Sequence, residues 1–254
     1  TVTFLGNQTQ TIRLLNAITT ASTGVINFNG TVSPVFNSSS SPQFATVNIN
    51  NTAPIIASQP WTVFVAININ AGATWNGGPL THTFYNNFNN AGTVISSGKL
   101  LFAPTITANI DLGSNFTTTN QVEFGGSGEI NLTDDNPTFE SLTISNTNAA
   151  GITPATVWTV AQDVSIRSGA QLNGSTFNHY FTGQWTNNGI FNGQTSTITF
   201  RSTSGTDAII GSGTNNFNNI VFDTNTVMDV VADISVSTDF TNNATTLNFI
   251  DHFV

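Results

Sequence analysis

The chain has 254 residues with 4 basic and 13 acidic side chains, so its formal charge of −9 rests on only 7% charged residues. Asn, Thr, Ser and Gly predominate, whereas Lys, Glu and Met are rare, and this composition excludes an α-rich fold. The 20 Phe residues, together with many Ile and Val, are enough to fill a core and argue against disorder.

In chain order, the first local signals are short segments in which apolar and polar residues alternate. Such alternation predicts β-strands with one buried and one solvated face. The segments are rich in Val, Ile, Thr and Phe, and Asn, Gly, Ser or Pro separate them, as tight turns require. The predicted strands are residues 2–4, 45–49, 62–69, 80–84, 141–144, 195–200, 219–222 and 234–240.

A repeat of about 98 residues underlies these segments. The pattern Thr-Val-Thr-Phe at 1–4 recurs as Lys-Leu-Leu-Phe at 99–102 and as Thr-Ile-Thr-Phe at 197–200, both times after 98 residues. Between these anchors, Trp61 matches Trp158 and His82 matches His179, each at a step of 97 residues. We therefore expect three repeats, at residues 1–98, 99–196 and 197–254, within one continuous solenoid.

The third repeat is shorter, and its shortening indicates the fold. From Phe102 to Phe139 is 37 residues, but from Phe200 to Phe217 is 17, so a block of 20 residues is missing. A solenoid tolerates such a loss if about 20 residues make one coil, because each coil contacts only its neighbours. The predicted fold is an all-β parallel β-helix, expected to be right-handed, with coils of about 20 residues. The alternative, tandem β-sandwich domains, explains the repeat period but not the missing block.

The segment 181–192 leads into the anchor at 197–200, and a Gly-Ser-Gly spacer at 211–213 precedes the run at 217–222. This order of elements resembles the β-solenoid repeats of large secreted surface adhesins of Bacteroidetes. The resemblance covers most of the chain and implies type IX secretion, an extracellular or cell-surface location, and a role in adhesion, gliding or surface architecture. The C-terminal sorting domain of that family is absent from this sequence, and the Ser-rich stretch at 38–42 departs from its pattern.

Few residues suggest catalysis or a cofactor. Parallel β-helices include polysaccharide lyases, but Arg167 and Arg201 have no acid–base partner nearby in sequence. Asp134 and Asp135 are expected to lie in a solvated turn and are only weak candidates for calcium, because hard cations bind clustered oxygen ligands. A later acidic set could line one face in the same way. That set is Asp223, Asp229, Asp233 and Asp239. No catalytic residue is predicted, and calcium is the one cofactor considered.

The aromatic and histidine side chains are divided between core and ligand roles. Because His82 and His179 occupy equivalent places in the repeat, we interpret both as structural groups inside the solenoid. The same argument places Trp61, Trp158 and Trp185 in the core rather than on a sugar-binding surface. Trp75 pairs with Leu172 in the repeat, which is also an exchange typical of a core position. Tyr85 and Tyr180 are the only polar aromatic residues and are retained as ligand candidates.

The sequence therefore predicts a non-catalytic structural or adhesive segment of an extracellular surface protein or filament, acting as a stiff rod. Both ends look uncapped, since 1–4 is already anchor pattern and 249–254 is apolar, and exposed solenoid ends pair with further strands. The expected partners are adjacent modules or identical subunits, joined head to tail, and surface glycans. The four scattered basic residues exclude nucleic acid, and the lack of a long apolar run excludes membrane insertion. The alternative function is a carbohydrate-binding module or polysaccharide lyase that uses a side groove.

Overall fold

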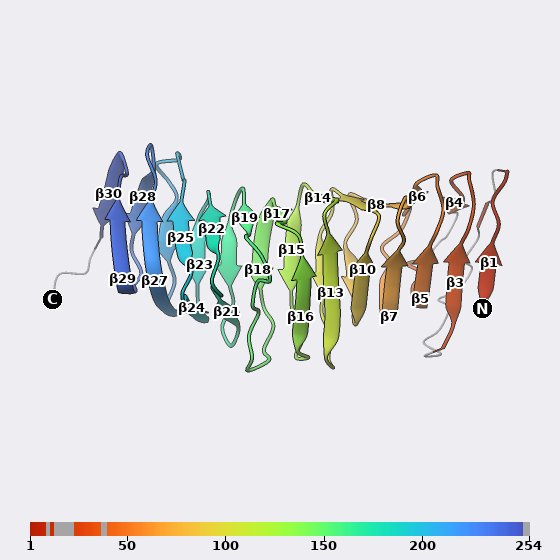
Figure 1. The fold of residues 1–254 in the computed structure, drawn as a ribbon, viewed down its shortest axis with the longest axis horizontal. Helices are drawn as coiled ribbons and strands as arrows, with labels where there is room; N and C mark the ends of the chain where they lie inside the picture. The colour runs from red at the N-terminus through yellow and green to blue at the C-terminus, as the bar shows by residue number, and fades with distance from the viewer. Residues whose placement is uncertain (9–10, 13–22, 37–39, 251–254) are drawn as a thin grey trace. The chain divides into compact units, whose positions relative to one another are not determined.

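The computed structural model describes residues 1–8, 11–12, 23–36 and 40–250. Arg13, the serines at 38 and 39, and the terminal residues 251–254 lie outside the described part. Every described element is a β-strand, and no helix in it is long and apolar enough to cross a membrane. The chain divides into two compact units. Figure 1 labels strands of both units along the ribbon.

Unit 1 comprises Thr1–Val122 and Gly126–Asp135. Its strands are β1 (Val2–Phe4), β2 (Thr11–Ile12), β3 (Val25–Phe28), β4 (Val35–Phe36), β5 (Gln43–Ile49), β6 (Ile55–Ile56), β7 (Thr62–Ile69), β8 (Thr74–Gly78), β9 (His82–Phe84), β10 (Asn87–Asn90), β11 (Thr93–Ser96), β12 (Leu100–Phe102), β13 (Ala108–Gly113), β14 (Phe116–Thr118) and β16 (Ile130–Asp134). The division between the units falls within β15 (Gln121–Phe124).

Unit 2 comprises Glu123–Gly125 and Asn136–Val254. Its strands are β17 (Thr138–Phe139), β18 (Ser141–Ile144), β19 (Thr159–Val160), β20 (Val164–Ile166), β21 (Gln171–Asn173), β22 (Asn178–Phe181), β23 (Trp185–Asn187), β24 (Ile190–Asn192), β25 (Thr197–Phe200), β26 (Ala208–Ile210), β27 (Thr214–Phe222), β28 (Val227–Val230), β29 (Ser235–Asn242) and β30 (Thr246–Phe249).

Within each unit the strands stack in parallel ladders, which makes the fold a parallel β-solenoid. Unit 1 has the ladder orders β1-β3-β5-β7-β9-β12 and β6-β8-β11-β14, and β7 also pairs with β10, followed by β13 and β16. Unit 2 has the orders β18-β20-β23-β26-β28-β30 and β17-β19-β22-β25-β27-β29, and β21 and β24 pair in turn beside β27. Parallel pairing excludes the alternative of β-sandwich domains, whose sheets are antiparallel.

The register of the ladders gives the coil length directly. Val47 pairs with Ile67 on the next coil, and Leu142 pairs with Val164. The coils average about 21 residues, which confirms the predicted coil length. The block missing from the third repeat is therefore equivalent to about one coil. The division of the solenoid into repeats at 1–98, 99–196 and 197–254 stays a prediction.

Inward-facing side chains fill the core of each unit with aromatic rings and aliphatic groups. In unit 1, Phe4 stacks on Phe28 with ring centroids 5.5 Å apart. In unit 2, Phe200 stacks on its register partner Phe222 with ring centroids 5.5 Å apart. Such stacked pairs follow from parallel register, because equivalent side chains of successive coils point the same way, about 4.8 Å apart.

One corner of the coil recurs in both units and requires glycine. Asn90 Oδ1 accepts a hydrogen bond from the Gly92 N–H at 3.1 Å, and Asn187 Oδ1 accepts one from the Gly189 N–H at 2.9 Å. A Cβ atom on Gly92 would lie 2.4 Å from the Ala73 carbonyl oxygen, and one on Gly189 would meet the matching oxygen of the preceding coil at 2.3 Å. The two corners occupy equivalent places in the sequence repeat. The same hydrogen bond from a glycine N–H to an asparagine side chain therefore recurs with the repeat.

We expect Gly92→Ala to lower the free energy of unfolding by about 1–3 kcal/mol, because backbone atoms of the neighbouring coil must move to admit the methyl group. Gly205→Ala is the matched control, since its Cβ would meet nothing closer than Val227 Cγ1 at 3.7 Å. Urea unfolding followed by circular dichroism measures both variants. Equal stability of the two would contradict the close approach at this corner.

Candidate functional site

His82 links neighbouring segments inside unit 1. Its Nδ1 accepts a hydrogen bond from the Trp61 backbone N–H at 3.0 Å, and its Nε2 lies 2.8 Å from the Gly77 carbonyl oxygen. Since a backbone N–H can only donate, Nδ1 must be unprotonated and Nε2 must donate its proton to Gly77. The side chain is fully buried, so both ring nitrogens are used by the fold.

His179 repeats this arrangement in unit 2. The Trp158 backbone N–H donates to its Nδ1 at 3.1 Å, and Nε2 donates to the Gly174 carbonyl oxygen at 2.8 Å. Burial lowers the pKa of His82 to about 4 and also lowers the pKa of His179, while the hydrogen bonds to glycine oppose this change. Both side chains are thus structural, as the repeat predicted.

We expect stability to fall as the pH drops from about 6.5 towards 4. The unfolded chain takes up protons at the ordinary histidine pKa of 6.5, whereas folded His82 resists protonation until about pH 4. Between pH 7 and pH 5, His82 alone contributes about 2 kcal/mol to this loss. His82→Gln keeps a hydrogen-bond acceptor and a donor but cannot titrate, so its unfolding free energy should depend less on pH by that amount. If His82→Gln left the pH dependence of the unfolding free energy unchanged, the lowered pKa of folded His82 would be contradicted.

All four tryptophans are buried in the core, as expected from their repeat positions. Trp185 Nε1 donates to Asn215 Oδ1 at 2.9 Å. Trp75 Nε1 is a buried donor without a hydrogen-bond partner, and its ring packs edge-on against His82 at 4.8 Å between centroids. None of these indole rings is available as a surface on which a sugar could stack.

Asp134 and Asp135, the calcium candidates, lie at the end of β16. Asp134 is buried at a register shift, opposite Gly113 of β13, whereas Asp135 is exposed beyond the strand. The later acidic set does not converge either. Within residues 1–8, 11–12, 23–36 and 40–250, no three His, Asp or Glu side chains form a group able to hold a metal ion.

Tyr180, the second tyrosine candidate, is covered by a cation. The Arg201 guanidinium lies 3.9 Å from the centre of the Tyr180 ring, and Arg201 Nε forms an ion pair with Asp223 Oδ2 at 3.2 Å. The three residues come from successive coils, so they fasten β22, β25 and the end of β27 together. One face of the Tyr180 ring is therefore occupied by the arginine, and the residue is half-buried.

Tyr85, the first tyrosine candidate, is placed differently. Its ring stacks on Phe64 with centroids 5.3 Å apart and planes inclined by 6°, and 37% of the residue is exposed. It lies at the bend between β9 and β10, directly after buried Phe84. The pair forms an aromatic step on the outside of unit 1.

Rows of asparagine side chains run beside this step, and the sequence analysis missed them. In the first row Asn48 Nδ2 donates to Asn27 Oδ1 at 2.7 Å, Asn68 to Asn48 at 2.6 Å, and Asn89 to Asn68 at 2.7 Å. We call these four residues the amide row. A second row joins Asn29, Asn50 and Asn70 in the same way. The signal that could have found both rows is the pattern Asn-x-Asn at 27, 48 and 68.

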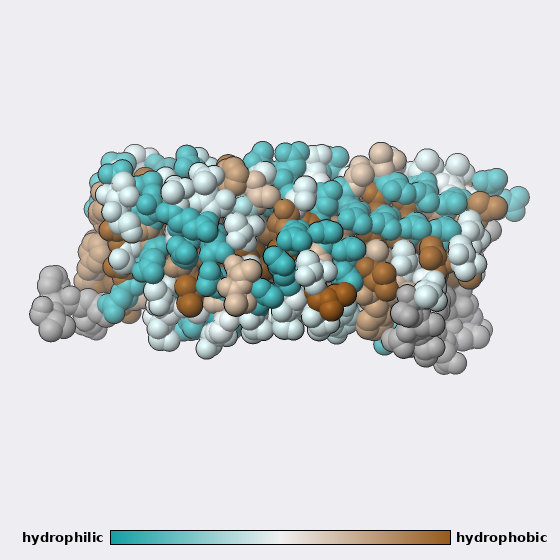
Figure 2. Space-filling model, turned by 60° about the horizontal axis from the view of Figure 1, so that its bottom comes forward, coloured by the Kyte–Doolittle hydropathy of each residue, from teal (hydrophilic) through white to brown (hydrophobic). Residues whose placement is uncertain are grey.

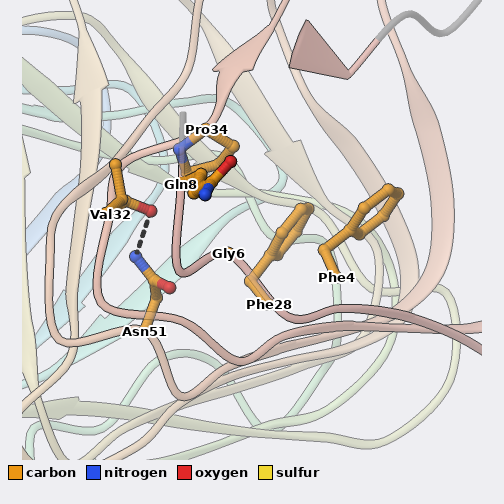
Figure 3. A pocket seen from close by; sticks show the side chains of 7 residues that line it. All are labelled: Phe4, Gly6, Gln8, Phe28, Val32, Pro34 and Asn51. Carbon is orange, nitrogen blue, oxygen red and sulfur yellow. Dashed lines mark hydrogen bonds between the residues drawn. The ribbon is translucent and has the colours of Figure 1, made fainter. Parts of the chain in front are cut away.

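The face of the molecule drawn in Figure 2 is covered mostly by hydrophilic residues, with separate hydrophobic residues between them. Two hollows of the described part of the chain bear on ligand binding. The first, beside β1 and β3 (Figure 3), contains Phe4 and Phe28, and Asn51 Nδ2 there donates to the Val32 carbonyl oxygen at 3.2 Å. Its volume of about 10 Å³ suits one water molecule.

The second hollow is an open groove of about 500 Å³ in unit 2. It is lined by turns of three successive coils, at 147–149, 169–171 and 188–190. Its polar groups already serve the fold: Asn148 Oδ1 accepts from the Ala150 N–H at 3.0 Å, and Gln171 Nε2 donates to Asn173 at 2.8 Å. Aromatic and charged side chains are missing from the lining residues, so the groove offers little to orient a ligand.

Comparisons with protein-family models, with curated proteins and with solved structures find no match to this chain.

Proposed function

We propose that the chain is a non-catalytic structural and adhesive segment of an extracellular surface protein or filament, acting as a stiff repetitive rod that continues head to tail. The resemblance to secreted surface adhesins of Bacteroidetes and the weakly charged, Asn- and Thr-rich composition favour this proposal. The β-solenoid fold is compatible with it, because parallel coils can be added without a change of design.

The observation that supports the proposal most strongly is that the histidine and tryptophan side chains and Arg201 are engaged in contacts within the fold. Both ring nitrogens of His82 and of His179 form hydrogen bonds to the backbone, and the four tryptophans are buried in the core. Arg201 is held between Tyr180 and Asp223. These groups strengthen contacts between coils, which is the property that a structural segment requires.

Strands with one unpaired edge support continuation into a further module or subunit. Among the described strands, β1 pairs with β3 alone, β29 with β27 alone, and β30 with β28 alone. Apolar side chains lie exposed beside these edges, including Val2 and Leu5 in unit 1 and Phe240 and Phe249 in unit 2. An exposed strand edge with apolar side chains is a template for pairing with another chain.

We expect Phe240→Lys to suppress head-to-tail association, because it places a charge beside the open edge of β29, where Phe240 is 45% exposed. Sedimentation velocity over a range of protein concentrations, with electron microscopy of the same samples, measures the association. The unmodified chain should form assemblies that grow with concentration, whereas the variant should remain monomeric.

Ile95→Lys is the matched control for this test. Ile95 is 43% exposed, but its strand β11 is paired on both edges, with β8 and β14. The control variant should therefore assemble like the unmodified chain. A strictly monomeric unmodified chain, or equal effects of the two lysines, would overturn head-to-tail continuation.

The alternative function, carbohydrate binding or polysaccharide cleavage, has one observation in its favour. The exposed aromatic step of Phe64 and Tyr85 lies beside neutral amide groups, a combination that suits sugars. It suggests binding rather than cleavage, because asparagine amides neither donate nor remove protons at neutral pH.

A further inference from the structure

We propose that Phe64, Tyr85 and the amide row together form a binding surface for a neutral glycan chain, which specifies the adhesive part of the function proposed above. The surface lies within unit 1 and is made by four successive coils. Its parts are an aromatic ring with an open face, a row of amides with unused hydrogen-bonding capacity, and an absence of charge along that row.

The Tyr85 ring is held rigidly and covered on one side. Phe64 lies opposite Tyr85 in the register that pairs Val63 with Phe84, and the two rings are almost parallel. On the following coil, Ala103 takes the equivalent position, since its N–H bonds to the Phe84 carbonyl oxygen at 2.8 Å. A methyl group covers much less of the ring than Phe64 does, and 37% of Tyr85 is exposed, so the second face of Tyr85 has room for a flat apolar group, such as the C–H face of a sugar ring.

The amide row has donors and acceptors to spare. A carboxamide has two N–H donors and two lone pairs on its oxygen. Asn48 and Asn68 each donate once, to the preceding coil, and accept once, from the following coil. Each therefore keeps one N–H and one lone pair for a further partner. These groups recur at the spacing of the coils, about 4.8 Å, so they suit a polymer that presents hydroxyl groups at regular intervals.

The aromatic step and the amide row adjoin along the chain. After Phe64, the next outward-facing positions are Ala66 and Asn68. After Tyr85, they are Asn87 and Asn89, which pair in register with Ala66 and Asn68. The extended chain from Tyr85 to Asn89 spans at most about 13 Å. An oligosaccharide of a few rings can therefore lie on the tyrosine and reach the amides at once.

Charge selects a neutral ligand. Thr3 and the four members of the amide row are uncharged, and the first acidic residue in this register is Asp111, opposite Asn89 on the next coil. A sulfated, phosphorylated or uronic-acid polymer would need Lys or Arg at the surface, and would be repelled by a chain with a formal charge of −9. The neutral amides fit the hydroxyl groups of an uncharged polysaccharide.

The test is affinity electrophoresis of the full chain in gels that contain β-glucan, xylan, galactomannan or pullulan, with alginate as the anionic comparison. At least one neutral polysaccharide should retard the unmodified chain. Tyr85→Ala should weaken binding by about tenfold or more, as for an aromatic residue at the centre of a contact. Tyr85→Phe should retain most of the binding, and Asn68→Leu should weaken it.

Tyr180→Ala is the matched control, because it removes the other tyrosine, whose ring is covered by Arg201. It should bind like the unmodified chain, and circular dichroism verifies that all variants are folded. The proposal would be overturned if no neutral polysaccharide retarded the chain, or if alginate retarded it more strongly. It would also be overturned if Tyr85→Ala and Tyr180→Ala lost equal amounts of glycan affinity. The Phe240→Lys variant alters assembly and leaves this surface intact, so it should still bind the glycan. Its glycan binding therefore tests the binding surface independently of head-to-tail continuation.

Discussion

Every feature of this protein depends on backbone hydrogen bonds between successive coils in parallel register. Because the register repeats once per coil, each side chain lies next to its equivalent on the neighbouring coil, about 4.8 Å distant. Inside, this brings Phe200 onto Phe222 with centroids 5.5 Å apart. Outside, it brings Asn68 onto Asn48. One constraint thus produces both the aromatic core and the polar surface.

The regular part of the fold could be predicted from the sequence, because alternation and the missing block depend only on the chain itself. The strands at 2–4, 62–69 and 141–144 have the predicted bounds, residue for residue. The prediction for β27 was incomplete, since it included only 219–222 of Thr214–Phe222. Asn215 explains the difference, because its side chain is buried and accepts hydrogen bonds from Trp185 and Asn187. The alternation of apolar and polar residues would have placed this polar side chain in solvent.

The candidate site was less predictable, because it depends on which residues the coil offset brings together. Nothing in the sequence ranks Tyr85 above Tyr180. The distinction comes from their neighbours and their exposure: Phe64, one coil before Tyr85, stacks on one ring face and leaves 37% of the residue exposed, whereas Arg201, one coil after Tyr180, lies over the ring of a less exposed residue. Since the offset varies from coil to coil, such partners cannot be assigned before the register is known. The histidines were easier to interpret, because duplication itself indicated a structural role.

The amide row also has a direction. Each asparagine donates its hydrogen bond to the preceding coil, from Asn89 to Asn68 to Asn48 to Asn27, so the carboxamide dipoles align head to tail and polarise one another. The two ends of the row are therefore chemically different: acceptor oxygens face one way and donor groups the other. A polysaccharide also differs between its reducing and non-reducing ends. A chain bound along the row would meet different atoms when reversed, so this surface can align polymer chains with a single polarity.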